Sequence, residues 1–221
     1  MTVTLINPFV VPPDQEADFV ASWRKVATAL SAQPGYLDAR LHRSLDRNAR
    51  FRFVNVAHWD SQNAWAEAMQ AFPSDGAPAD GIVPNPALYE PVAGEAVAPE
   101  DAVRGNAPVT ITENSLFTQI VEFEVPADRQ AALIRAIAAE VERWVRHRPG
   151  FVSSSFHASH DGTRVINYAQ WRSEADFRAF VADPESEHIG AAIRRVGGVS
   201  GPQATHCRVV RVIKPGSGKQ S

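Results

Sequence analysis

Asn55-Val56-Ala57-His58-Trp59 recurs further along the chain as Asn167-Tyr168-Ala169-Gln170-Trp171. Upstream of these stretches, Pro34-Gly35-Tyr36 is matched by Pro149-Gly150-Phe151. The matches keep one order along the chain, which is the sequence signature of an internal repeat. We infer a tandem duplication, and the copies decide the fold.

The two copies divide the 221 residues nearly in half. We expect a first unit at residues 1–105 and a second unit, with a C-terminal tail, at residues 106–221. A linker rich in Ala, Pro, Glu and Gly runs from Val92 to Pro108, mostly within the first unit. Each copy has the pattern strand, helix, strand, strand, helix and closing strand, which predicts an α+β fold. Apolar residues at helical spacing predict the first helix of each copy: they are Phe19, Trp23, Val26 and Leu30, and then Leu133, Ile137, Val141 and Trp144.

The turn and helix-cap residues between the elements also repeat. Asp161-Gly162 predicts a hairpin turn, and Ser61 and Ser173 stand where a helix N-cap belongs. The copies then diverge: Asp183-Pro184 opens a further helix in the second copy, whereas the first copy has a Pro/Gly-rich stretch from Phe72 to Pro86. We therefore expect the pocket of the first copy to be open to water.

The composition excludes several classes of protein. A net charge of -3 gives no basic surface for nucleic acid, and no apolar run approaches the length of a membrane span. Cys207 is the single cysteine, which favours a reducing cytoplasm. The seven histidines have no metal-ligand spacing, and no nucleotide-binding motif is found, so we expect neither metal nor cofactor.

Residues two apart on a strand share a face, and this rule selects a candidate site. Asn167 and Trp171 fall on one face of their strand, as do Asn55 and Trp59 in the first copy. An Asn in the middle of an apolar face is costly unless its amide is satisfied, so its presence in both copies invites a functional interpretation. The alternative is structural: Asn167 hydrogen-bonds a loop and Trp171 is core.

The second copy contains Phe156-His157-Ala158-Ser159, Asp161-Gly162-Thr163 and the Asn167 to Trp171 stretch. With these motifs it resembles the cofactor-free, quinone-forming monooxygenases of aromatic polyketide pathways, within the antibiotic biosynthesis monooxygenase family. The first copy, with Arg52 to Trp59, resembles the broader family. The resemblance implies two ferredoxin-like units in tandem, whose antiparallel sheets pair into a pseudo-dimer like a dimeric α/β barrel. A homodimer of the tandem chain is a further expectation.

The resemblance also implies an activity: oxidation of a polycyclic phenol or anthrone by O2, with the Asn and Trp matching Asn167 and Trp171 in catalysis. His157 is the candidate for proton transfer, since the unperturbed pKa of histidine is near 6.5. Candidate substrate-binding residues are Tyr168, Phe177, Asn55, Trp59 and Arg194. In the family a tyrosine stands at Phe177 and an arginine near Gly190, with Arg194 nearby but shifted. For Asn55 and Trp59 the structural interpretation is favoured.

Three alternatives stay open. Haem degradation occurs in related branches, but the residues it needs are split between the copies: Asn7 and Trp59 in the first, His188 in the second. An oxygenase that uses reduced flavin from a partner leaves no nucleotide motif in this chain. A non-catalytic binding protein of the same fold is the third.

Overall fold

The computed structural model describes residues 1–71, 80–96 and 116–217. The chain forms two compact units, Met1–Tyr89 with Val209–Ser221, and Glu90–Arg208. The two strands that close the repeats, β5 (Ala87–Ala96) and β9 (Ser200–Ile213), each contribute residues to both units. Each unit is described below by itself.

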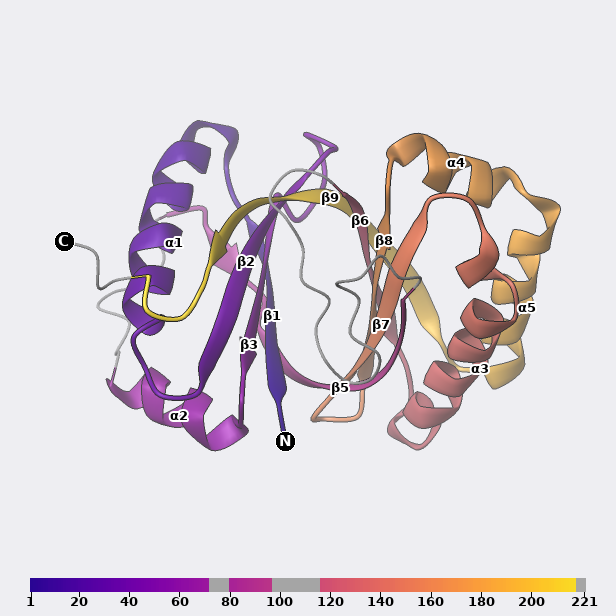
Figure 1. Ribbon diagram of the computed structural model, residues 1–221, viewed down its shortest axis with the longest axis horizontal. Helices are drawn as coiled ribbons and strands as arrows, with labels where there is room; N and C mark the ends of the chain where they lie inside the picture. The colour runs from indigo at the N-terminus through magenta and orange to yellow at the C-terminus, as the bar shows by residue number, and fades with distance from the viewer. Residues whose placement is uncertain (72–79, 97–115, 218–221) are drawn as a thin grey trace. The chain divides into compact units, whose positions relative to one another are not determined.

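The first unit is an antiparallel sheet with helix α1 against one face (Figure 1). Strand β3 pairs with both β2 and β1, and β1 pairs in turn with β4 and with the start of β5. The elements of this unit besides β5 are β1 (Val3–Val10), η1 (Pro13–Gln15), α1 (Glu16–Leu30), β2 (Tyr36–Ser44), β3 (Phe53–Trp59), α2 (Gln62–Ala71) and β4 (Val83–Pro84).

The second unit repeats this plan and adds a helix (Figure 1). Strand β8 pairs with β7 and β6, and the first part of β9 pairs with β6. Its elements besides β9 are β6 (Phe117–Glu124), η2 (Ala127–Arg129), α3 (Gln130–Arg143), η3 (Val145–His147), β7 (Phe151–Ser159), β8 (Arg164–Trp171), α4 (Glu174–Ala182), η4 (Pro184–Ser186) and α5 (Glu187–Val196).

Each copy therefore has its strands in the spatial order second, third, first, fourth, which is the ferredoxin-like order. The predicted α+β class and tandem ferredoxin-like units are confirmed. In both units the helix-facing side of the sheet is the core, because alternate strand residues turn their apolar side chains toward the first helix. Phe53 and Trp59 occupy that side in one unit, and Phe117 and Trp171 in the other.

The Pro-Gly turns that revealed the repeat have a common physical cause. Gly35 has φ 77° and Gly150 has φ 78°, in the left-handed region that favours glycine. An added Cβ at Gly150 would lie 2.2 Å from Cγ of Asp176, on the first turn of α4. The turn thus needs glycine both for its dihedral angles and for the close approach of the following helix.

The predicted helix caps are confirmed. The Ser173 hydroxyl accepts the backbone N–H of Asp176 at 3.1 Å, and Ser61 accepts that of Ala64 at 3.2 Å. Asp183 accepts from the backbone N–H of Glu185, and a 3-10 turn there precedes α5.

Two predicted boundaries need correction. Val92 to Ala96 belongs to strand β5 rather than to the linker, because backbone pairing continues the strand despite a linker-like composition. The remainder of the predicted linker, including the 105/106 boundary, and residues 72–79 of the Pro/Gly-rich stretch lie outside the described residues. The compact units also differ from the sequence halves, because the described C-terminal residues 209–217 belong to the first unit.

Candidate active site

The second unit contains a cavity of about 610 Å³ between its sheet and helices α3 and α5. Its walls are mostly apolar side chains, such as Val121, Ile137 and Ile193. Asn167 and Trp171 both line it, together with Ser154 from the neighbouring strand. A concave, mainly apolar cavity of this size with a few polar groups is typical of small-molecule sites.

The strand register brings these polar residues to one face. Ser154 lies opposite Ala169, and Phe156 lies opposite Asn167, in the β7–β8 pair. Residues paired across a sheet share a face, so Ser154, Asn167 and Trp171 all face the helices. The prediction that Asn167 and Trp171 share one face is confirmed.

The side chain of Asn167 is held by one hydrogen bond. The Ser154 hydroxyl donates to Oδ1 of Asn167 at 2.7 Å. Within the described residues the amide nitrogen Nδ2 has no hydrogen-bond partner. Asn167 is partly exposed, so this amide group has two N–H donors left for a ligand in the cavity.

The indole of Trp171 is packed on three sides. Its ring lies 4.8 Å from Phe180, 5.4 Å from Phe151 and 6.0 Å from Phe177, centroid to centroid. The side chain is 1% exposed, and Nε1–H has no hydrogen-bond partner in the described part of the chain. A buried donor without a partner costs about 1–3 kcal/mol, so a ligand that accepts from it would recover stabilisation.

Helix α5 forms the opposite wall and contributes a charged pair. Arg194 and Glu187 both line the cavity, and the Arg194 guanidinium donates to the Glu187 carboxylate. A Cβ added at Gly190 would lie 3.1 Å from Nη1 of Arg194. The guanidinium of Arg194 therefore lies back along the helix over Gly190, beside the position where we expected the family arginine.

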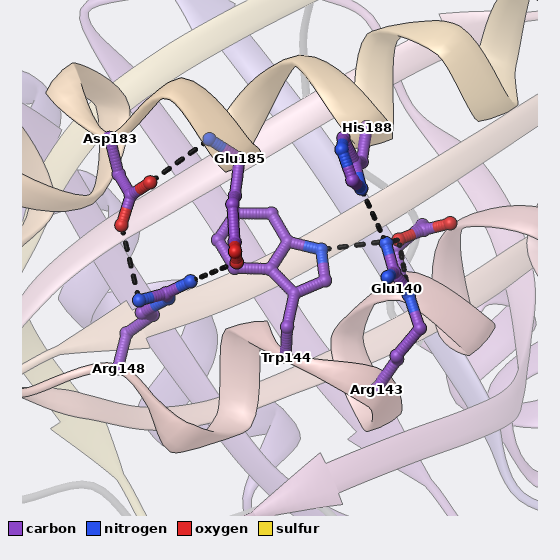
Figure 2. Close-up of polar contacts among 7 residues, drawn as sticks. All are labelled: Glu140, Arg143, Trp144, Arg148, Asp183, Glu185 and His188. Carbon is purple, nitrogen blue, oxygen red and sulfur yellow. Dashed lines mark hydrogen bonds and ion pairs between the residues drawn. The ribbon is translucent and has the colours of Figure 1, made fainter.

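A polar network fixes the segment that joins α4 to α5 (Figure 2). Arg148 stacks on the Trp144 indole, 4.8 Å from the ring centroid, and pairs with both Asp183 and Glu185. On the other side of Trp144, Arg143 donates to Nδ1 of His188 at 2.6 Å (Figure 2). Ser186 and Glu187, between these anchors, line the cavity, so the network holds one of its walls.

Three predicted site residues of the second copy lie elsewhere. His157 pairs with Ile166, and Tyr168 with Ser155, on the sheet face opposite the cavity. Nε2 of His157 contacts the Ser155 hydroxyl at 3.2 Å. Neither residue lines the cavity, since each lies one position from a residue on the helix-facing side of its strand. Phe177 is core, with its ring stacked 5.0 Å from that of Phe117.

In the first unit the corresponding pair is buried and bonded. The Trp23 indole N–H donates to Oδ1 of Asn55 at 3.1 Å, and Asn55 is 8% exposed while Trp59 is 1% exposed. The expectation of a first-copy site open to water is wrong for these residues, because a bulky indole covers the asparagine. His42 lies on the opposite face, against the carbonyl oxygen of Val54 at 3.2 Å.

Ser154 and the position of His206 were not predicted from the sequence. His206 pairs with Gln119, a cavity-lining residue, and its ring lies 5.0 Å from Phe177. Burial lowers the pKa of His206, which keeps the imidazole neutral. The neighbouring Cys207 is buried, and burial raises the pKa of its thiol, so it is a poor nucleophile.

Among the described residues there is no cluster of three or more His, Cys, Asp or Glu arranged to hold a metal ion. The helices of the described ranges are also too short or too polar to cross a membrane.

Comparisons with known proteins agree with the repeat. The family model described as Antibiotic biosynthesis monooxygenase matches residues 2–72 and 116–193. Among curated proteins, the tetracenomycin-F1 monooxygenase of Streptomyces glaucescens is 43% identical over 100 residues, which are 45% of this chain and 77% of that protein.

Two solved structures share the fold over nearly the whole chain. An anthrone oxidase-like protein has a TM-score of 0.78 and 20% identity, covering 98% of this chain and 94% of its own. A ferredoxin fold protein from Listeria monocytogenes, related to antibiotic biosynthesis monooxygenases, has a TM-score of 0.50 and 12% identity, covering 96% of this chain and 95% of its own. At these identities the likeness concerns the fold.

Proposed function

Because the chain belongs to the antibiotic biosynthesis monooxygenase family and is an oxidoreductase of that family, we propose that its second unit oxidises a polycyclic phenol or anthrone with O2. The observation that carries this proposal is the cavity of about 610 Å³ with the unpaired donors of Asn167 and Trp171 on its sheet side. The substrate is of the aromatic polyketide class, in keeping with the tetracenomycin-F1 monooxygenase relative.

The reaction needs little from the protein beyond control of charge. In an anthrone, loss of a proton gives an electron-rich anion that reduces O2 directly. One oxygen atom replaces the two hydrogens of the ring CH2 as a carbonyl, and the other leaves with those hydrogens as water. No metal or tightly bound cofactor is required for this balance, so we propose a cofactor-independent enzyme.

The cavity residues have distinct roles in this proposal. Nδ2–H of Asn167 donates to the substrate oxygen on which negative charge develops, as oxyanion-stabilising donors do. Nε1–H of Trp171 is a second donor, and the guanidinium of Arg194, which is paired with Glu187, has further N–H donors for the anionic substrate. The apolar walls exclude water, which strengthens each of these interactions.

His157 has no place in this mechanism, because it lies on the other sheet face. In the same proposal Tyr168 does not contact the substrate, since it lies on that face too, and Phe177 acts by packing beside Trp171. In this proposal a water molecule that enters with the substrate accepts the proton, and the resulting substrate carbanion reduces O2.

Oxygen uptake with an anthrone substrate tests the proposal. We expect uptake and quinone formation by the purified chain in the presence of a metal chelator, and no dependence on added reduced flavin. Turnover that appears only with reduced flavin would assign the flavin-dependent alternative. A Soret band and loss of haem on incubation with haem and a reductant would assign haem degradation. Absence of all three activities would assign the non-catalytic binding protein.

A further inference from the structure

Asn167 differs from Asn55 in what holds its side-chain oxygen. In the second unit the donor to Oδ1 is the Ser154 hydroxyl, 2.7 Å away and on the adjacent strand. In the first unit the donor is the indole of Trp23, 3.1 Å away on helix α1. Both amides are thus fixed through the oxygen, but by partners from different elements.

Neither unit has the donor residue that the other unit uses. The residue equivalent to Ser154 is Ala39, since Ala39 pairs with Ala57 as Ser154 pairs with Ala169. Ala39 has no hydroxyl to offer. The residue equivalent to Trp23, counted from the prolines before each helix, is Ile137, which has no donor and lines the cavity.

We propose that Ser154 is a positioning residue, which fixes the amide of Asn167 so that Nδ2–H, rather than the oxygen, faces the cavity. The inference rests on the proposed function, in which Asn167 is a donor to the substrate. Ile137, which lines the cavity, stands where the first unit has the indole that holds its asparagine. Ser154 restores the missing hydrogen bond from the sheet side without occupying the cavity.

The chemistry explains why orientation matters. The two ends of a carboxamide are nearly equal in size, so an Asn side chain without a fixed partner can turn by a half rotation. A turned Asn167 would present Oδ1 to the cavity, and a carbonyl oxygen repels a developing oxyanion. Ser154 is 2% exposed and its hydroxyl donates to Oδ1 of Asn167 at 2.7 Å, which favours one orientation of the amide.

The test is a double-mutant cycle on the full chain, with Ser154→Ala, Asn167→Ala and both together. We expect Ser154→Ala to lower kcat/KM about tenfold. It should have no further effect in the Asn167→Ala background, because Ser154 acts through the Asn167 side chain. Ser154→Thr keeps a hydroxyl and should keep most of the activity. Ser155→Ala, one residue along but on the opposite face, is the matched control and should change kcat little.

A loss of equal size in both backgrounds would overturn the positioning role, and so would full activity in Ser154→Ala while Asn167→Ala is impaired. The side-chain amide resonances of Asn167 give a readout independent of turnover: they should shift or broaden in Ser154→Ala and stay unchanged in Ser155→Ala. If those resonances move while Asn167→Ala retains full activity, the positioning holds and the proposed function fails. Unchanged resonances in Ser154→Ala would overturn the positioning.

Discussion

Trp23 donates its indole N–H to Asn55 at 3.1 Å, whereas Ile137, at the equivalent position of the second repeat, lines the cavity beside Asn167. One side chain on the first helix of each copy thus differs beside the asparagine: an indole bonds it in the first unit, and an isoleucine lines the cavity in the second. Ile137→Trp should close the cavity, because an indole replaces a smaller side chain that faces free space.

We expect Ile137→Trp to abolish substrate binding and turnover while the melting temperature stays equal or rises. Arg135→Trp places the same indole on an exposed position of the same helix and is the matched control. Binding measured by fluorescence titration of a quinone product would check this. Undiminished binding by a folded Ile137→Trp protein would mean that ligands use another site.

Much of the fold could be predicted from the sequence because its signals are local and repeated. The Pro-Gly turns at Gly35 and Gly150, the cap at Ser173 and the helical stripes each have a short-range physical cause. The closing strands could not be assigned to units in this way. Whether residues 209–217 pack with the first or the second copy depends on long-range pairing, which a repeat alignment does not contain.

Only the part of the candidate site that lies on one strand could be predicted, for a similar reason. Period-2 alternation placed Asn167 and Trp171 on one face of a single strand. Relating His157 to that face requires the register between two strands, and the irregularity between Phe151 and Ser153 shifts it. Ser154 escaped notice because its function depends on a diagonal contact across strands, and the cavity depends on the absence of an indole at Ile137.

The division of β9 between the units predicts that residues 1–105 are incomplete alone. Ile213 belongs to the first core, and its carbonyl oxygen accepts from the Tyr36 hydroxyl at 3.0 Å. We expect the 1–105 fragment to aggregate or dimerise, since it exposes apolar sheet surface. Appending residues 209–217 through a flexible linker should raise its melting temperature, and a stable monomeric 1–105 fragment would contradict the argument.

His42 makes the stability of the fold depend on pH. Burial lowers its pKa to about 3, while in the unfolded chain it is about 6.5. Between these values only the unfolded state binds the proton, so stability falls as pH falls from 6.5 toward 3, by about 1.4 kcal/mol per unit. Urea unfolding near pH 7 and pH 5 should show a loss about 2 kcal/mol larger in the wild type than in His42→Gln.

His147→Gln, on the exposed surface, is the matched control and should behave as the wild type does. An equal pH dependence in His42→Gln and the wild type would mean that other groups dominate the acid sensitivity.

Arg148 should control the wall between α4 and α5. Arg148→Met keeps an apolar stem against Trp144 but removes the pairs with Asp183 and Glu185. We expect faster hydrogen exchange in residues 183–188 and a severalfold higher KM with little change in kcat, because the loss affects binding and not the reacting atoms. Arg178→Met breaks an exposed pair on α4 and should alter neither quantity. Slow exchange in Arg148→Met would show that apolar packing alone holds the wall.

The two copies should contribute unequally to turnover. Asn167→Ala or Trp171→Phe removes an unpaired donor beside the cavity, so kcat/KM should fall at least tenfold, about 1.4 kcal/mol of transition-state stabilisation. Asn55→Ala leaves the buried Trp23 indole without its acceptor, and Trp59→Phe thins a fully buried core, so these variants should lower the melting temperature instead. Steady-state kinetics with thermal melts of all four variants separate lost chemistry from lost stability. Equal kinetic losses from both copies would mean two working sites, and a loss confined to Asn55 and Trp59 would place the chemistry in the first unit, against the assignment made from the cavity.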